Sequence, residues 1–205
     1  MPVLTDIYRY PIKSTHGETL VASTVTSQGL PADRAWMVAD ASGRMVTGRT
    51  DPVLVRVTAS VSNEALTLSA PGRADLTVAC AQFADPAAAS VWKDDFAAWG
   101  GADAADAWLS EFLGKPVRLL YCGDQSNRRM RSQPEQALGF ADAYPLLLIG
   151  QGSLDELNRR IGRELSMSRF RPNLVVTGAE PFAEDGWKRI RIGSTVLRIE
   201  KPCER

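Results

Sequence analysis

The N-terminal part of the chain is built of short segments in which apolar and polar side chains alternate, with turn residues between them. Alternation over about four to eight residues is typical of a half-buried β-strand. The segments with this pattern are 3–10, 19–26, 35–40, 45–47, 53–60, 65–69 and 76–79. Their spacing of roughly ten residues predicts a β-barrel or a β-sandwich in this part of the chain.

The alternation is lost after Cys80. Residues 85–101 hold three consecutive alanines and two tryptophans without a clear period, which predicts irregular chain with short strand pieces. Residues 125–136 are polar and basic and predict a mobile loop. Strands are again expected at 116–121, 146–149, 174–177, 188–192 and 195–200. This change in character places a boundary between two intertwined halves of the chain within residues 80–118.

Two helices complete the predicted set of elements. Residues 103–113 carry an apolar stripe and are followed by Gly114, which suits the left-handed position after a helix. Ser153-Leu-Asp-Glu156 has the pattern of a capping box and predicts a second helix that runs to about Gly162. The predicted fold class is therefore α+β and mostly β, with β-barrel cores and a few flanking helices.

Composition narrows the range of partners and compartments. The 24 basic and 24 acidic residues cancel, so no global field attracts nucleic acid or a membrane surface. Three widely spaced cysteines argue against a disulfide framework and for a reducing compartment. The N-terminus lacks the pattern of a signal peptide, and the longest apolar run, 144–149, is too short to span a bilayer. We therefore expect a cytoplasmic protein without a nucleic-acid or membrane partner.

Three short motifs place polar groups beside predicted strand ends: Lys13-Ser14, Asp33-Arg34 and Arg171-Pro172-Asn173. Side chains at strand ends can converge on one mouth of a barrel. A lysine, guanidinium groups, a hydroxyl and an amide suit a buried phosphate or the edge of a pterin. On spacing alone, the alternative that these are unrelated surface charges stays open.

The remaining candidates for chemistry are few. Cys203 is either a small buried apolar side chain or, with its charged neighbours, an exposed thiol whose thiolate is stabilised. Cys80 and Cys122 lack zinc-ligand spacing and are predicted to lie in the core. His16 is the only histidine, which excludes a multi-histidine metal centre. The arginines at 128–131 fit a solvated basic loop or a lid over an anionic ligand.

Several motifs occur in the order seen in MOSC-domain proteins. They are Tyr10-Pro-Ile-Lys-Ser14, Gly29-Leu-Pro-Ala-Asp-Arg34-Ala-Trp36, Phe170-Arg-Pro-Asn173, Glu184-Asp-Gly-Trp187, Ile192-Gly193 and Pro202-Cys203-Glu-Arg205. From residue 3 to its end the chain resembles bacterial YcbX-like proteins and the mitochondrial amidoxime-reducing component. The resemblance implies a MOSC N-terminal β-barrel region at 1–118 followed by a MOSC β-barrel domain at 119–205. It also implies a molybdenum cofactor (molybdopterin), with pyridoxal phosphate binding as a further family-level expectation.

The resemblance also implies an activity and a set of site residues. It implies an oxidoreductase that reduces a small N-hydroxylated substrate with electrons from a flavoprotein or a ferredoxin-type domain. The metal and its sulfur ligands would carry the redox chemistry, while the protein supplies orientation and charge. Asp142 matches an acidic residue near the metal centre. The residues matched to the pterin and its phosphate are Lys13, Ser14, Arg34, Arg171 and Asn173.

The carboxyl end departs from the family pattern Pro-Cys-x-Arg-Cys, in which the second cysteine is the metal ligand. This chain stops at Arg205 and holds only the first cysteine, Cys203, which is therefore the fallback for the catalytic and metal-ligating thiolate. The resemblance accordingly implies a MOSC domain that is truncated at its C-terminus. Two alternatives stay open: a non-catalytic carrier of sulfur or cofactor that uses Cys203, and a folded remnant without function.

Overall fold

The computed structural model describes residues 1–203 except 63, 124 and 125. The described chain is mostly sheet with two α-helices, which confirms the predicted α+β, mostly β class. It divides into two compact units. One unit comprises residues 1–8, 19–25 and 146–205, and the other comprises 9–18 and 26–145. Among the described residues, no helix has the length and apolar character needed to cross a membrane.

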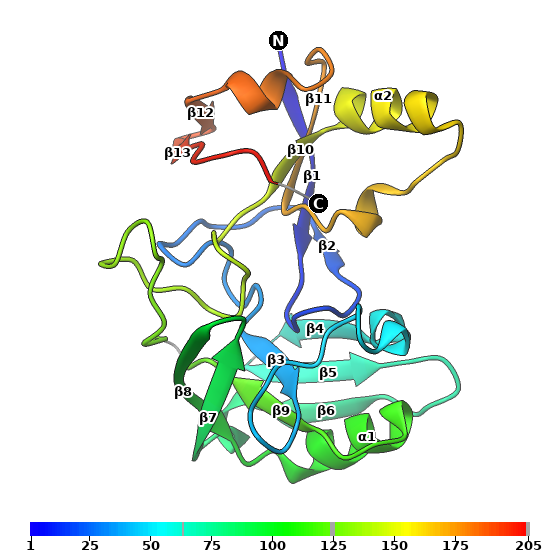
Figure 1. Cartoon of the computed structure of the whole chain (residues 1–205), viewed down its shortest axis with the longest axis vertical. Coiled ribbons are helices and arrows are strands. Elements are labelled where there is room, and N and C mark those ends of the chain that lie inside the picture. The colour runs from blue at the N-terminus through cyan, green and yellow to red at the C-terminus, as the bar shows by residue number, and fades with distance from the viewer. Residues whose placement is uncertain (63, 124–125, 204–205) are drawn as a thin grey trace. The chain divides into compact units, whose positions relative to one another are not determined.

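The larger unit contains two antiparallel sheets (Figure 1). The first has the order β3 (Trp36–Ala39), β9 (Arg118–Tyr121), β8 (Asp94–Gly100) and β7 (Asp85–Val91). The second has the order β4 (Thr58–Ser62), β5 (Ala65–Ser69) and β6 (Leu76–Ala79). All four residues of β3 are buried, whereas β5 buries only Leu66 and Leu68, as alternation predicts. Trp36, Leu119 and Phe140 belong to the core cluster that these strands enclose.

The helix α1 (Asp103–Leu113) covers this core and lies against β6 and β9 (Figure 1). Its bounds are those predicted from the sequence. Trp108 and Leu109 face inward, and Gly114 takes the left-handed conformation at φ 67° that ends the helix. Asp106 accepts a hydrogen bond from the backbone of Leu119 at 2.7 Å, which ties the helix to β9.

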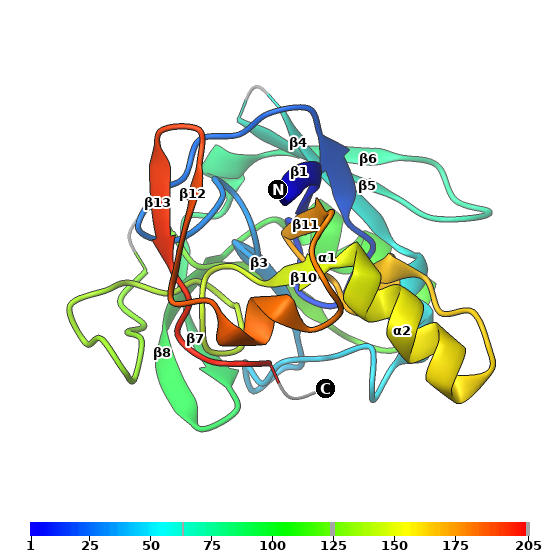
Figure 2. The same ribbon diagram turned by 90° about the horizontal axis from the view of Figure 1, so that it is seen from above.

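The smaller unit contains a four-stranded sheet in the order β10 (Leu148–Gly150), β11 (Leu174–Thr177), β1 (Val3–Arg9) and β2 (Glu18–Leu20). β10 and β11 run parallel, and α2 (Gln151–Ile161) makes the crossover between them. The hairpin of β12 (Arg189–Ile192) and β13 (Thr195–Arg198) forms a separate two-stranded sheet, and Figure 2 shows its two strands side by side.

Four expectations from the sequence were wrong in detail. Residues 85–101 form the regular hairpin β7–β8 instead of irregular chain, because small alanines alternate inward without giving a strong apolar signal. Residues 21–25 are exposed and lie outside β2. Residues 45–47 form no strand, and among them only Met45 makes an isolated bridge, to Ala39. Residues 52–56 form a short 3₁₀ helix that starts at a proline.

The second helix also begins differently from the prediction. α2 starts at Gln151 with Gly150 before it, so Ser153 does not cap it. The Ser153 hydroxyl instead accepts a hydrogen bond from the backbone of Phe182 at 2.8 Å. The predicted end is confirmed, since Gly162 takes the left-handed conformation after the helix. The boundary predicted at residue 118 is a different division from the two compact units and remains a prediction.

Candidate functional site

Lys13 is the buried centre of the candidate site. Pro11 ends the strand before it, and the Lys13 backbone N–H donates to the carbonyl of Trp36 at 2.8 Å. The side chain is buried, and its Nζ donates to the carbonyl of Phe140 at 2.9 Å and to Oδ1 of Asp142 at 2.6 Å. The Asp142 side chain is 51% exposed. The ion pair therefore links a buried ammonium to a carboxylate that is partly exposed to solvent.

Burial makes the protonated form of Lys13 less favourable than it is in water. Burial lowers the pKa of Lys13 to about 8, the Asp142 carboxylate raises it, and the guanidinium groups of Arg34 and Arg128 lower it again. The carboxylate therefore does not offset the loss of hydration and the positive field of the two arginines. The surroundings of Nζ would gain from an additional negative group.

Both the side chain and the backbone of Arg34 are held by neighbouring residues. Its Nη1 donates to Oδ2 of Asp33 at 2.5 Å, and its guanidinium lies 4.4 Å from the ring centroid of Tyr10. Its backbone N–H donates to the carbonyl of Tyr10, and its carbonyl accepts from the backbone N–H of Phe140. Arg34 and Ser14 both have positive φ, at 48° and 71°. Residues with side chains take this conformation where the surrounding structure imposes it, often at functional sites.

Arg128 supports the segment that carries Asp142. Its Nε and Nη2 donate to Oδ2 of Asp94 at 3.0 and 2.9 Å. Its further hydrogen bonds go to the carbonyls of Gly139, Ala141 and Asp142. The Arg128 side chain is only 3% exposed, so the prediction of a solvated basic loop is wrong for this residue. Buried charge with all five N–H groups donated is a structural anchor.

Trp92 was not found by sequence reasoning. It occupies the turn of the β7–β8 hairpin, and its Nε1 donates to the same Asp142 oxygen as Lys13, at 2.9 Å. The guanidinium of Arg49 lies 5.4 Å from the centroid of the Trp92 ring. Asp142 thus receives hydrogen bonds from a buried ammonium and from a half-exposed indole.

The other predicted residues lie in the smaller unit. Asn173 is buried; its Nδ2 donates to the carbonyl of Tyr8 at 3.1 Å, and its Oδ1 accepts from the backbone of Leu147 at 3.2 Å. Its amide therefore joins β1 to the chain before β10. Arg171 has a positive φ of 57° and is half-buried, and Cys203 is exposed. The ligand roles predicted for these three residues remain predictions.

The structure brings Lys13, Asp142 and Arg34 together within the larger unit, with Ser14 next to Lys13 in the chain. Cys122 is buried as predicted, Cys80 is half-buried, and His16 is exposed. Among the described residues, no three histidine, cysteine or carboxylate side chains are grouped to hold a metal ion.

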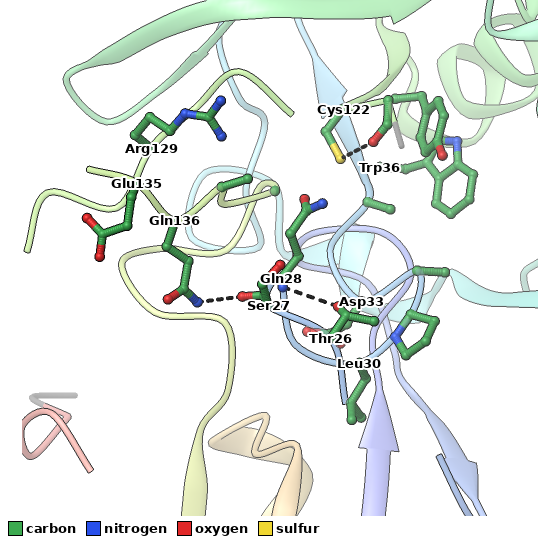
Figure 3. A pocket seen from close by; sticks show the side chains of 17 residues that line it. Thr26, Ser27, Gln28, Leu30, Asp33, Trp36, Cys122, Arg129, Glu135 and Gln136 are labelled. Atoms are coloured by element: carbon green, nitrogen blue, oxygen red, sulfur yellow. Dashed lines mark hydrogen bonds between the residues drawn. The ribbon is translucent and has the colours of Figure 1, made fainter. Parts of the chain in front are cut away.

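A hollow of about 720 Å³ opens in the larger unit next to this cluster (Figure 3). Asp33, which holds Arg34, is part of its wall, together with the aromatic pair of Trp36 and Tyr121. Gln136 donates from Nε2 to the carbonyl of Ser27, a contact drawn as a dashed line in Figure 3. The volume lies in the range of small-molecule sites.

The donor set fits the anionic part of a molybdenum cofactor. A phosphate needs cationic and N–H donors in a place from which water is excluded. Lys13 and Arg34 supply both, and Lys13 is buried, which lowers its pKa. The fold and site together define an α+β protein with a buried cluster of cationic side chains.

Comparison with known proteins identifies the family. The MOSC N-terminal beta barrel domain matches residues 1–116, and the MOSC domain matches residues 135–205. Mitochondrial amidoxime-reducing component 1 of Homo sapiens is 30% identical over 218 residues, covering 98% of this chain and 64% of the relative. The Mus musculus protein of the same name is 32% identical over 216 residues, covering 98% and 63%.

Molybdenum cofactor sulfurase of Oryza sativa subsp. japonica is 28% identical over 227 residues, covering 98% of this chain but 27% of the relative. The chain belongs to the MOSC-domain proteins, a molybdenum cofactor-related family, as its motifs indicated. It spans about 64% of the length of the human amidoxime-reducing relative. Cytoplasmic location and pyridoxal phosphate binding remain predictions.

Proposed function

We propose that this chain binds a molybdenum cofactor and forms the core of a reductase for small N-hydroxylated compounds. The observation that carries the proposal is the buried Lys13 ammonium, which pairs with Asp142 and whose pKa is lowered by burial and by the charges of Arg34 and Arg128. The names of the amidoxime-reducing relatives supply the reaction class. The reaction takes two electrons and two protons, breaks the N–O bond and releases water.

The residues proposed to hold the cofactor are Lys13, Ser14, Arg34 and Arg171, and Asn173 is proposed to position the chain beside Arg171 through its backbone hydrogen bonds. When bound, the cofactor supplies a metal on sulfur ligands that can take up an oxygen atom and change oxidation state. Cys203 is the fallback thiolate within this chain. Its thiol is exposed and can therefore meet a ligand.

The protein contributes charge and protons in this proposal. The guanidinium groups of Arg34 and Arg171 are proposed to neutralise the phosphate, for which a planar fork of donors is suited. Nζ of Lys13, whose pKa of about 8 lies near neutrality, holds a proton beside the half-exposed carboxylate of Asp142. A donor with such a pKa can release a proton at neutral pH more readily than an ordinary lysine. Nζ is therefore the proposed proton donor, and the Asp142 carboxylate orients it.

The proposed partners are a small N-hydroxylated substrate and an electron donor, either a flavoprotein or a ferredoxin-type domain. The cytoplasm is the proposed compartment. These assignments extend the family membership and the composition of the chain, and each can fail without changing the assignment of the cationic site.

Cofactor loading tests the proposal. The chain would be produced in a host that makes molybdopterin, and molybdenum and pterin would be measured per chain. We expect both in the wild-type protein and their loss in Lys13→Met and Arg34→Met. Arg163→Met, which removes an exposed cation of the smaller unit, is the control and should load normally. Absence of molybdenum and pterin from the wild-type chain would contradict cofactor binding.

A second candidate is a carrier of sulfur or cofactor without turnover. The exposed thiol of Cys203 and the similarity to a molybdenum cofactor sulfurase favour it. Intact-mass spectrometry after incubation with a sulfane-sulfur donor would then show one added sulfur atom, lost in Cys203→Ser and retained in Cys80→Ser. No adduct on the wild-type chain excludes this role. If cofactor loading fails as well, a folded remnant is the remaining explanation.

A further inference from the structure

Trp92 occupies a conformation that its side chain does not favour. Val91 pairs with Asp94, so Trp92 and Lys93 form the two-residue turn of the β7–β8 hairpin. Trp92 has a φ of 56°. A hairpin turn with positive φ at its first position is ordinarily filled by glycine, and a bulky side chain there is an outlier. Such strain persists where the surroundings hold it and frequently marks a ligand site.

Two contacts hold the Trp92 ring in place. Its Nε1 donates to Oδ1 of Asp142 at 2.9 Å, and the Arg49 guanidinium lies 5.4 Å from its centroid. Neither contact buries the ring, since Trp92 remains 50% exposed. The Asp142 side chain is 51% exposed as well. A flat apolar surface and a hydrogen-bond acceptor are therefore fixed beside each other and open to solvent.

We propose that the Trp92 ring and the Asp142 carboxylate form a substrate subsite for a flat N-hydroxylated group, such as an arylamidoxime. The plane of the ligand stacks on the indole, and its N–H or O–H groups donate to the carboxylate. This assignment rests on the proposed reductase function for the class of substrate. Its ligand binding does not require the cofactor.

The chemistry of the subsite selects such a ligand. Aromatic rings prefer offset stacking with other conjugated planes. A carboxylate accepts hydrogen bonds strongly from N–H and O–H groups, and it repels an anion. Lys13 and Trp92 both donate to the same oxygen of Asp142, which fixes the orientation of the carboxylate. A preorganised acceptor loses little entropy when the ligand binds.

A structural alternative assigns Trp92 to clamping the Asp142 segment onto the hairpin. The two assignments predict different results for Trp92→Gly. Glycine removes the strain of the positive φ at position 92. If Trp92 forms a subsite, Trp92→Gly should therefore have an unchanged or slightly higher melting temperature and bind the ligand more weakly. A clamp expects a lower melting temperature and no specific effect on the ligand.

The experiment measures binding of benzamidoxime to the cofactor-free full chain by isothermal titration calorimetry. Trp92→Gly should weaken binding by about threefold to tenfold, the range for loss of one stacked ring. Asp142→Asn should weaken it by about tenfold, because a charged acceptor becomes neutral. Trp92→Phe keeps a ring in the strained turn and should bind with intermediate affinity.

Trp99→Phe is the matched control, since Trp99 is 41% exposed on the adjacent strand β8. It should bind benzamidoxime like the wild type. Equal affinity of the wild type and Trp92→Gly, or no binding by the wild type, overturns the subsite. If the chain binds benzamidoxime but takes up no cofactor, the subsite stands and the reductase function is rejected. If the loaded chain is active and Trp92→Gly leaves its KM unchanged, the reductase function stands and the subsite is rejected.

Discussion

Lys13 and Asn173 lie beside strand ends in different units of the molecule, and both are buried, but their polar atoms are used differently. Nζ of Lys13 faces the carboxylate of Asp142 and a carbonyl, and its pKa is lowered to about 8. The amide of Asn173 bonds to the backbone on both sides and joins two strands. The first region holds a charge that an anionic ligand would stabilise, whereas the second uses its polar atoms within the fold.

The strongest test of this comparison is Arg128→Met, which removes the anchor of the Lys13 region. Asp94 and three carbonyls would lose their buried donor. Breaking a buried ion pair typically costs about 3–5 kcal/mol, and we expect a loss of this size in the free energy of unfolding, measured in urea. Arg131→Ala is the control, because Arg131 binds the same Asp94 but its side chain is 70% exposed.

The control should cost at most about 1 kcal/mol, as exposed ion pairs do. Similar losses for the two variants would show that the region around Lys13 and Asp142 is not held by a buried frame. The buried Arg128 would then contribute no more to stability than the exposed Arg131.

The pH dependence of stability tests the charge on Lys13. Below pH 8 the lysine is protonated in both the folded and the unfolded state. Between pH 8 and about 10.5 the folded state has lost the proton while the unfolded state keeps it, so stability rises with pH in this window. Relative to Lys13→Met, the wild type should gain about 3 kcal/mol across it.

Urea unfolding of both proteins at several pH values measures this difference, and the other titrating groups cancel in it. A difference that stays constant from pH 7 to pH 10.5 would mean that Lys13 has an ordinary pKa. The Lys13 region would then resemble Asn173, with its polar atoms satisfied inside the fold.

Asn173→Ala tests the other side of the comparison. It leaves the Tyr8 carbonyl and the Leu147 N–H without their amide partner, at an expected cost of about 1–3 kcal/mol in unfolding free energy. Asn127→Ala, at an exposed position, should change stability little. If Asn173→Ala unfolds like the wild type but takes up less cofactor, Asn173 acts on a ligand and the comparison is wrong.

Elements with strong local signals were predictable from the sequence. The helix at 103–113 combines an apolar stripe with a glycine that takes the left-handed conformation, so both its existence and its end were found. The β7–β8 hairpin was missed because alanine contributes little to a strand pattern and Trp92 occupies a turn position that favours glycine. Local rules fail where tertiary contacts impose the conformation.

The site was predictable only through its motifs. Lys13 and Asp142 are 129 positions apart, and no spacing rule brings them together. The family resemblance supplied both residues but not their ion pair. Burial of Arg128 depends on acceptors from two distant segments, so its local sequence indicated a solvated loop instead. Trp92 reaches Asp142 across 50 positions through a strained turn, which composition does not reveal.

The smallest expected effect is that of Asp142→Asn on Lys13. The carboxylate raises the pKa of Lys13 against the effects of burial and the arginines, so its neutralisation should lower this pKa further below its ordinary value. NMR titration of the lysine side-chain signals measures the change. Stability at neutral pH should fall by about 1 kcal/mol or less, because Asp142 is half-exposed and solvent screens the pair. Asp155→Asn, at an exposed site of α2, should leave the Lys13 titration unchanged. An unaltered Lys13 pKa in Asp142→Asn would mean that the pair is not formed in solution, and the half-exposed carboxylate would then have no fixed orientation toward a substrate.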